Sequence, residues 1–237
     1  MLLKADVLLR NGEPQAPRPR IETLSDLIFG LALSVGAISL LSRPPSNLGQ
    51  IVGDMLGFSF SFLILISFWL RYTEIMSVLP VENHTIVLIN VVMLLLVAIE
   101  PYLFNLVTLF NHAIDNPGLV DAASIMFAFD MAGLMAILGF FSHKLATEEK
   151  NLVPKILISK YKRMRNNLFA YAAVFMFTAL PQFWAYTIDG TPIRFYLWLI
   201  PLVVFWLGRR FWERPLTKKR GKAKNAVTSA GGFRENL

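Results

Sequence analysis

Two acidic residues lie deep inside long apolar stretches of this 237-residue sequence, where charged side chains are rare. Glu100 follows the run LINVVMLLLVAI and directly precedes Pro101, and Asp130 lies near the middle of another apolar run. In a membrane segment such a residue faces a bundle interior or an aqueous cavity. It can pair with a buried partner, line a water path or hold a proton. Glu100 and Asp130 are therefore candidates to line an outer vestibule or to titrate.

A second group of polar residues stands at the entrance to the first apolar segment. Arg20 and Asp26 are six residues apart, which is not the spacing of a helical i to i+4 pair. We therefore expect each to bind a different helix rather than the other. Ser25 and Asp26 offer an alternative, because side-chain oxygens near a helix N-terminus can also satisfy open backbone amides.

Enzymatic chemistry is not indicated. His84, His112 and His143 each lie near the end of an apolar segment and far from one another, which is typical of interfacial polar residues. The sequence contains no glycine-rich phosphate loop, no His–Glu pair on a helix and no nucleophile motif. We expect neither enzyme activity, nor a metal site, nor a bound cofactor. Asp54 and Asp121 are expected near the outer edges of their segments, where water is close.

Membrane helices are the elements that must position these residues. Hydrophobic residues make up 55% of the chain and charged residues 16%, and the mean hydropathy is +0.52. Soluble domains carry more charge, roughly 25%. The apolar residues fall in blocks long enough to cross a bilayer, which takes about 20 residues. We predict an all-α membrane protein with six transmembrane helices, at about residues 24–41, 51–70, 86–110, 119–141, 168–188 and 193–212.

The distribution of basic residues predicts the orientation. The net charge of +7 could suggest a nucleic-acid partner. However, if the N-terminus is cytoplasmic, all of the 23 lysines and arginines except Arg43 and Arg194 fall on the cytoplasmic side. We therefore predict cytoplasmic N- and C-termini, a multi-pass protein of the cell membrane, and no nucleic-acid partner. The basic segment 144–165 and the basic tail are expected to meet anionic lipid headgroups.

Polar segments divide the chain into three parts. Residues 1–19 contain three prolines and predict a flexible leader, residues 20–212 form the transmembrane domain, and residues 213–237 predict a basic disordered tail. Within the domain, Pro101 is expected to kink the third helix or break its outer turn. The sequence DGTP is expected to form the turn between the last two helices.

The first apolar segment carries a ladder on one side. At about 100° per residue, Leu27, Ser34, Val35 and Ile38 all fall within about 60° of Leu31. This face combines branched apolar side chains with one hydroxyl, while Gly30, on its flank, would let another helix approach closely. An ordinary packing face has the same pattern as a pore-lining face, so spacing alone leaves both interpretations open.

Residues 18–110 resemble a known family. The motif R-x-x-x-L-S-D at residues 20–26 is similar to the R-x-x-x-F-S-D signature that opens the first helix of the transmembrane protein 175 family of potassium channels. The runs SFLILISFW and LINVVMLLLVAIEP resemble the second and third helices of that family. A tryptophan, an asparagine and a proline recur there at similar places.

The resemblance implies a potassium-preferring cation channel whose first helix lines the pore with a hydrophobic constriction. One six-helix unit per chain implies a homotetramer, with K⁺ as the permeant ion. The residues at matching positions of the constriction are Leu31, Ser34, Val35 and Ile38. A polar network behind the pore helix is implied at Arg20, Ser25, Asp26, Trp69 and Asn90.

The sequence departs from the family pattern at Leu24, which replaces the signature phenylalanine, and at Tyr72, where a histidine is usual. Glu100 before the proline is also atypical. Two other functions remain compatible with the residues. One is a proton-coupled or small-solute transporter with Glu100 and Asp130 as titrating sites, and the other is a non-conducting membrane scaffold with a basic tail.

Overall fold

The structure is a computed structural model that describes residues 20–40, 47–79, 84–110, 117–147, 153–188 and 191–212, with the predicted leader and tail outside these residues. The described chain is almost entirely helical. Its elements are α2 (Arg20–Ser39), α3 (Leu48–Met76), α4 (His84–Phe110), α5 (Pro117–Ala146), α6 (Lys155–Thr178), α7 (Gln182–Ala185), β1 (Thr187–Ile188), β2 (Thr191–Pro192) and α8 (Ile193–Trp212).

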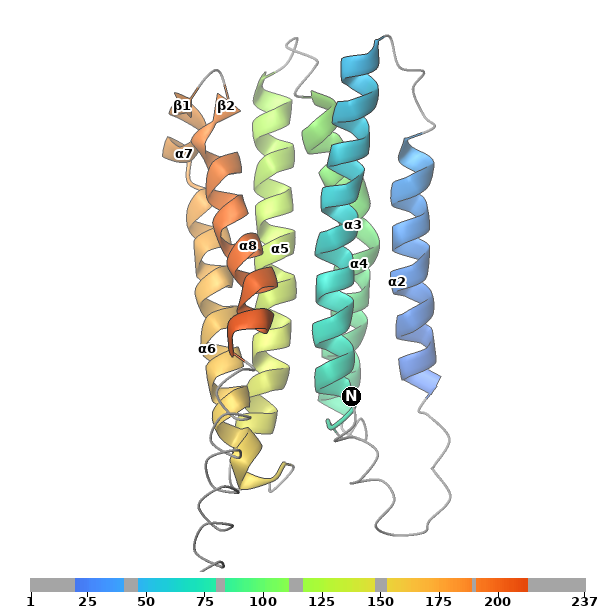
Figure 1. The fold of residues 1–237 in the computed structure, drawn as a ribbon, viewed down its shortest axis with the longest axis vertical. Helices are drawn as coiled ribbons and strands as arrows, with labels where there is room; N and C mark the ends of the chain where they lie inside the picture. The colour runs from blue at the N-terminus through green and yellow to red at the C-terminus, as the bar shows by residue number, and fades with distance from the viewer. Residues whose placement is uncertain are drawn as a thin grey trace, which may run out of the picture.

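The long helices run side by side along one axis (Figure 1). Helix α5 packs against α4 on one side and α6 on the other, and α8 packs against α6. Helix α2 packs against α4 and α3. The helix that holds the predicted pore face is thus at one side of the bundle.

Three of the described helices are long and apolar enough to cross a membrane. These stretches are Leu48–Met76, His84–Val107 and Gly118–Ala146, and α2 adds the shorter apolar stretch Thr23–Ile38. With these helices the chain is a multi-pass, membrane-embedded protein.

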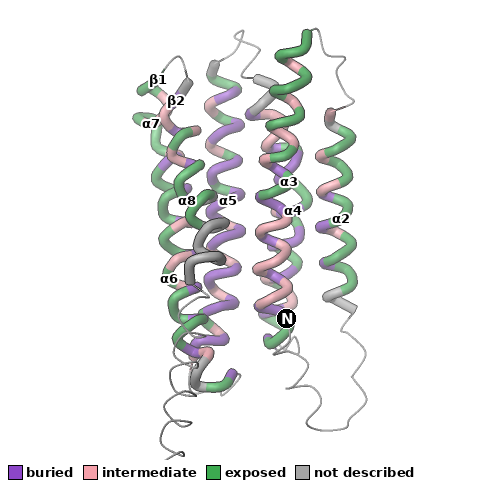
Figure 2. The backbone as a smooth tube through the Cα atoms, viewed as in Figure 1, coloured by how far each residue is buried: buried purple, intermediate pink, exposed green. Residues whose placement is uncertain are grey.

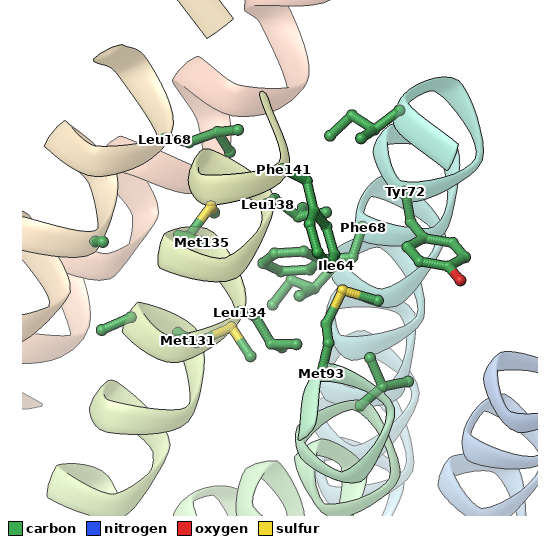
Figure 3. Close-up of a cluster of buried hydrophobic side chains, with 14 of the residues drawn as sticks. Ile64, Phe68, Tyr72, Met93, Met131, Leu134, Met135, Leu138, Phe141 and Leu168 are labelled. Atoms are coloured by element: carbon green, nitrogen blue, oxygen red, sulfur yellow. The ribbon is translucent and has the colours of Figure 1, made fainter. Parts of the chain in front are cut away.

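Helix α5 forms the centre of the apolar core. Met131, Leu134, Met135, Leu138 and Phe141 lie on α5 and are completely buried. In Figure 3 they face Ile64 and Phe68 of α3, Met93 of α4 and Leu168 of α6. Figure 2 shows the contrast between α5, buried along most of its length, and α2, exposed along much of one side.

The fifth predicted helix is wrong at both ends. The sequence predicted a span at 168–188, but α6 begins at Lys155 and ends at Thr178. The basic stretch before residue 168 is helical because Tyr161, Met164 and Leu168 recur at helical spacing and are buried. After Thr178 the chain turns through Pro181 into α7 and then β1.

Two prolines lie inside helices without ending them, so the expected break of the outer turn at Pro101 does not occur. Helix α4 continues through Pro101 to Phe110, and α8 likewise contains Pro201. The turn predicted at DGTP includes residues 189 and 190, which lie outside the described residues. The two strands on either side pair antiparallel, with Thr187 opposite Pro192 and Ile188 opposite Thr191.

Two glycines on α5 let its neighbours approach closely. A Cβ atom at Gly139 would lie 3.2–3.3 Å from the ring of Phe169 on α6. A Cβ atom at Gly133 would lie 2.9 Å from Leu96 Cδ1 on α4, closer than real Cβ contacts allow without a shift. The absence of a side chain at these positions therefore leaves room for the Leu96 side chain and the Phe169 ring against α5.

Candidate functional site

Two polar contacts fix the first turns of α2 to the last turns of α3. The indole Nε1 of Trp69 donates a hydrogen bond of 2.9 Å to Asp26 Oδ1. One residue earlier, the buried Ser25 hydroxyl hydrogen-bonds the Tyr72 hydroxyl at 2.6 Å. Asp26 thus has a partner on another helix, as its spacing from Arg20 led us to expect.

Tyr72 completes this contact although the sequence marked it as a departure from the family pattern. Its hydroxyl meets Ser25, and its ring lies 5.8 Å from the ring of Phe29, also on α2. The signal was available in the sequence, because Tyr72 follows Trp69 by three residues and so shares its helix face. Of the other network residues, Arg20 begins α2 but its side chain is not described. Asn90 is buried on α4 without a hydrogen-bond partner among the described residues.

The predicted ladder on α2 points away from the rest of the chain. Leu31 is 62% exposed, and Val35 and Ile38 are exposed as well. Ser34 lies on the same face and donates its hydroxyl to the Gly30 carbonyl, a local bond of 2.9 Å within the helix. The opposite side of α2 is packed, since Phe29 is only 2% exposed.

Glu100 and Asp130 lie in the interior of the bundle, not on the ladder. Glu100 is completely buried on α4, where the Ser61 hydroxyl of α3 donates to its two carboxylate oxygens at 3.2 Å each. Asp130 of α5 is 4% exposed, and neither of its carboxylate oxygens has a hydrogen-bond partner among the described residues. Burial inside one chain favours the titrating interpretation of these residues over the vestibule interpretation. Their role stays a prediction.

Sequence reasoning missed a buried arginine at the end of the bundle opposite the contacts between the start of α2 and the end of α3. Arg194, at the start of α8, is completely buried, and its Nη1 forms an ion pair with Asp121 Oδ1 of α5 at 2.6 Å. The guanidinium also donates to Ser124 Oγ and to the carbonyls of Thr178, Ala179 and Leu180.

This arginine connects three helices at one point. Its partners come from the start of α5 and the end of α6, and its own position is the first turn of α8. The Trp184 ring lies 5.6 Å from the guanidinium carbon and covers it. The sequence placed Asp121 near water, and its side chain is 28% exposed; the buried cation that it pairs with was not predicted.

Charged residues at the opposite end form a separate group. Glu74, near the end of α3, pairs with Lys160 of α6 at 2.6 Å and with Arg71 at 3.2 Å. His143 Nδ1 lies 3.2 Å from Arg165 Nη1. Within the described parts of the chain no group of three or more histidine, cysteine, aspartate or glutamate side chains could hold a metal ion.

One protein-family model matches the first three long helices of the chain. The model of the family described as "Endosomal/lysosomal potassium channel TMEM175" matches residues 20–101, which comprise α2, α3 and α4 as far as Pro101. The resemblance seen in the sequence is thereby confirmed over these residues. The comparison with curated proteins finds no match.

Solved structures extend the likeness to most of the chain. The fold is similar to that of a lysosomal potassium-selective channel TMEM175 homolog from Chamaesiphon minutus, with a TM-score of 0.54 at 17% identity over 79% of this chain and 95% of that one. It is also similar to a variant of the potassium channel MtTMEM175 in complex with a nanobody–MBP fusion, with a TM-score of 0.60 at 13% identity over 86% of this chain and 98% of that one. At these identities the likeness establishes a common fold.

Proposed function

We propose that this chain is a subunit of a potassium-preferring cation channel of the TMEM175 type, with α2 as the pore-lining helix. Four copies would place their α2 helices around one axis. The constriction would be formed by Leu31, Ser34, Val35 and Ile38. The match of residues 20–101 to the family model supports this proposal, because that region contains α2 and the helices that hold it.

The observation that carries the proposal is the exposed apolar face of α2. In a single chain Leu31 and its neighbours along the ladder face outward, although the other side of the same helix is packed. A Cβ atom at Gly30, beside Leu31, would have no atom of the described residues within 4 Å, so no contact among these residues requires a glycine there. Four copies of α2 around a common axis would account for both the exposed ladder and the small residue Gly30. Small residues let helices approach one another, and a ring of apolar side chains can gate by dewetting.

The contacts behind α2 fit the same role. A pore helix needs a fixed orientation, because a rotation would replace the residues that face the axis. The Asp26–Trp69 and Ser25–Tyr72 hydrogen bonds fix α2 near its start. The contact of Gly36 with Phe58 of α3 fixes it further along, with a built Cβ 3.6 Å from the Phe58 ring.

The proposal includes an orientation in the membrane. Six spans with both termini in the cytoplasm would place the start of α2 and the pairs of Glu74 on the inner side, in accordance with the positive-inside rule. The exposed Lys162 and Arg163 of α6 would then face anionic headgroups of the inner leaflet. Arg194 and Asp121 would lie toward the outer side.

Flux from reconstituted vesicles tests the function. We expect vesicles that contain the protein to release K⁺ down a K⁺ gradient faster than they release Na⁺ down a matched Na⁺ gradient. Protein-free vesicles should show neither flux. In native-like lipid the particle mass should be four times the 26.8 kDa of one chain.

The same vesicles distinguish the two alternative functions. Flux that requires a proton gradient would identify a proton-coupled transporter. In that case the buried Glu100 and Asp130 would be its titrating sites. Monomeric particles without any cation flux would leave the scaffold as the function. Either result would contradict the channel proposal.

A further inference from the structure

Glu100 of α4 and Asp130 of α5 lie at the same level of the contact between these two helices. The close approach of Gly133 on α5 to Leu96 on α4 defines this level of the bundle. Glu100 lies one turn beyond Leu96, and Asp130 lies almost one turn before Gly133. Because consecutive helices joined by a short connection run antiparallel, both steps lead in the same direction along the bundle. The helix register therefore places the two buried carboxyl groups near each other between α4 and α5.

Among the described residues, the surroundings of the pair provide one hydroxyl and no cation. Ser61 donates to Glu100, whereas the Asp130 oxygens lack a hydrogen-bond partner among the described residues. On α5 the nearest charged side chains are Asp121, which pairs with Arg194, and His143 and Lys144 more than three turns away. Among the charged side chains that the structure describes on the other packed helices, Asp54 is about two turns before Ser61 on α3, and Arg71 and Glu74 follow it by nearly three turns or more. His84 is more than four turns before Glu100 on α4, Asp26 lies in the first turns of α2, and the basic residues of α6 lie in its first turns.

Two buried carboxylates without a cation would be very costly. An isolated charge in an apolar interior costs several kcal/mol or more, and a second like charge beside it adds to that cost. A bound proton removes one negative charge, which lowers both the cost of burial and the repulsion between the two groups. It also turns an acceptor oxygen into a hydrogen-bond donor. Two carboxyl groups and a hydroxyl are a sparse set of ligands for a metal ion, in keeping with the absence of a metal-binding group among the described residues.

We propose that Glu100 and Asp130, together with Ser61, form a proton-binding site inside each subunit, between α3, α4 and α5. The site holds a proton at neutral pH. Asp130 is its principal carrier, because Ser61, the one hydroxyl that donates to the pair among the described residues, already serves Glu100. This inference rests on contacts within one chain and is independent of the proposed pore.

The site lies behind α2 rather than on its exposed face. Pro101, next to Glu100, contacts α2 at Gly36, where a built Cβ would be 3.9 Å from the Pro101 Cβ. Gly36 points about 140° away from Leu31 at about 100° per residue. The proton is therefore bound on the side of α2 that packs against the bundle. Glu100 is next in sequence to Pro101, which contacts α2.

Infrared spectroscopy of the full chain in lipid at neutral pH is the direct test. A protonated carboxyl group shows a C=O stretch that is separate from the bands of a carboxylate. We expect such a band in the unaltered protein, a weaker band in Asp130→Asn, whose amide imitates the protonated acid in shape, and no band when Glu100→Gln is added. Asp54→Asn, which removes a carboxyl group from the half-buried Asp54 of α3, is the matched control and should retain the band.

Unfolding measurements provide a second readout. If the folded state holds a proton that the unfolded chain releases, stability falls as pH rises, and the unfolding constant increases about tenfold per pH unit for each proton held. We expect this increase between about pH 5 and about pH 8. It should be reduced in Asp130→Asn, absent when Glu100→Gln is added, and unchanged in Asp54→Asn.

Three results would overturn the proposal. The first is an unaltered protein without a protonated carboxyl band at neutral pH. The second is a pH dependence of unfolding that persists in the double variant. The third is a band that disappears when K⁺ or Na⁺ is added at fixed pH, since a metal cation would then be the occupant. The channel proposal would survive all three, because none of them measures flux.

Discussion

Asp121→Ala will destabilise the folded chain far more than Asp26→Ala. Asp121 is the anionic partner of the completely buried Arg194, and its loss leaves a guanidinium in the interior without a counter-charge. Removing one partner of a buried ion pair costs about 3–5 kcal/mol. The remaining hydrogen bonds of Arg194 to backbone carbonyls favour the lower end of this range.

Asp26 offers the matched comparison. Its side chain is exposed and accepts one hydrogen bond from Trp69, which is worth about 1 kcal/mol when a neutral donor is left with access to water. The free energy of unfolding of both variants in mixed micelles checks the difference. Equal costs for the two substitutions would show that the Arg194 contacts do not hold α5, α6 and α8 together.

Leu31→Asn is expected to change conduction while leaving the fold intact. Leu31 is exposed in the single chain, so an amide there disturbs no intrachain packing. In a ring of four subunits it would place four polar groups at one level and let water fill the constriction. Lowering the barrier by about 1.4 kcal/mol would raise K⁺ flux about tenfold. Discrimination between K⁺ and Na⁺ should decrease at the same time.

Leu33→Asn is the control on the same helix. Leu33 is partly buried and packs against the core, on the side of α2 opposite Leu31. An amide there should lower yield or thermal stability, because burying an unpaired polar group costs about 1–3 kcal/mol. If Leu31→Asn merely destabilises the protein as Leu33→Asn does, and the remaining protein conducts as before, the ladder is a packing face.

Local pattern was sufficient to find most helices. The apolar runs at α3, α4 and α5 are long and uninterrupted, so their existence followed from composition and length. The fifth helix was misplaced because its first half is basic. There Tyr161, Met164 and Leu168 form a narrow buried stripe that a search for continuous apolar runs does not detect.

The site was only partly predictable, and the reason is distance along the chain. The spacing of Arg20 and Asp26 indicated partners on other helices, and the family resemblance pointed to Trp69. Arg194 and Asp121 are 73 residues apart, and no local pattern relates them. In the sequence, Ser61 is an ordinary hydroxyl residue in an apolar helix. Its hydrogen bond to Glu100, 39 residues away, follows only from the packing of α3 against α4.

The most direct test of the pore uses a single cysteine. The sequence contains none, so Leu31→Cys creates the sole thiol of the protein. Thiol reagents attack the thiolate, which requires water at the residue. The measurement is K⁺ flux from reconstituted vesicles before and after a charged, water-soluble thiol reagent. Leu95→Cys, on the exposed side of α4, is the control.

If residue 31 faces a water-filled pore, the reagent should abolish flux through Leu31→Cys. It should leave the cysteine-free protein and Leu95→Cys unaffected. An active Leu31→Cys protein that the reagent does not inhibit would contradict the assignment of α2 as the pore-lining helix.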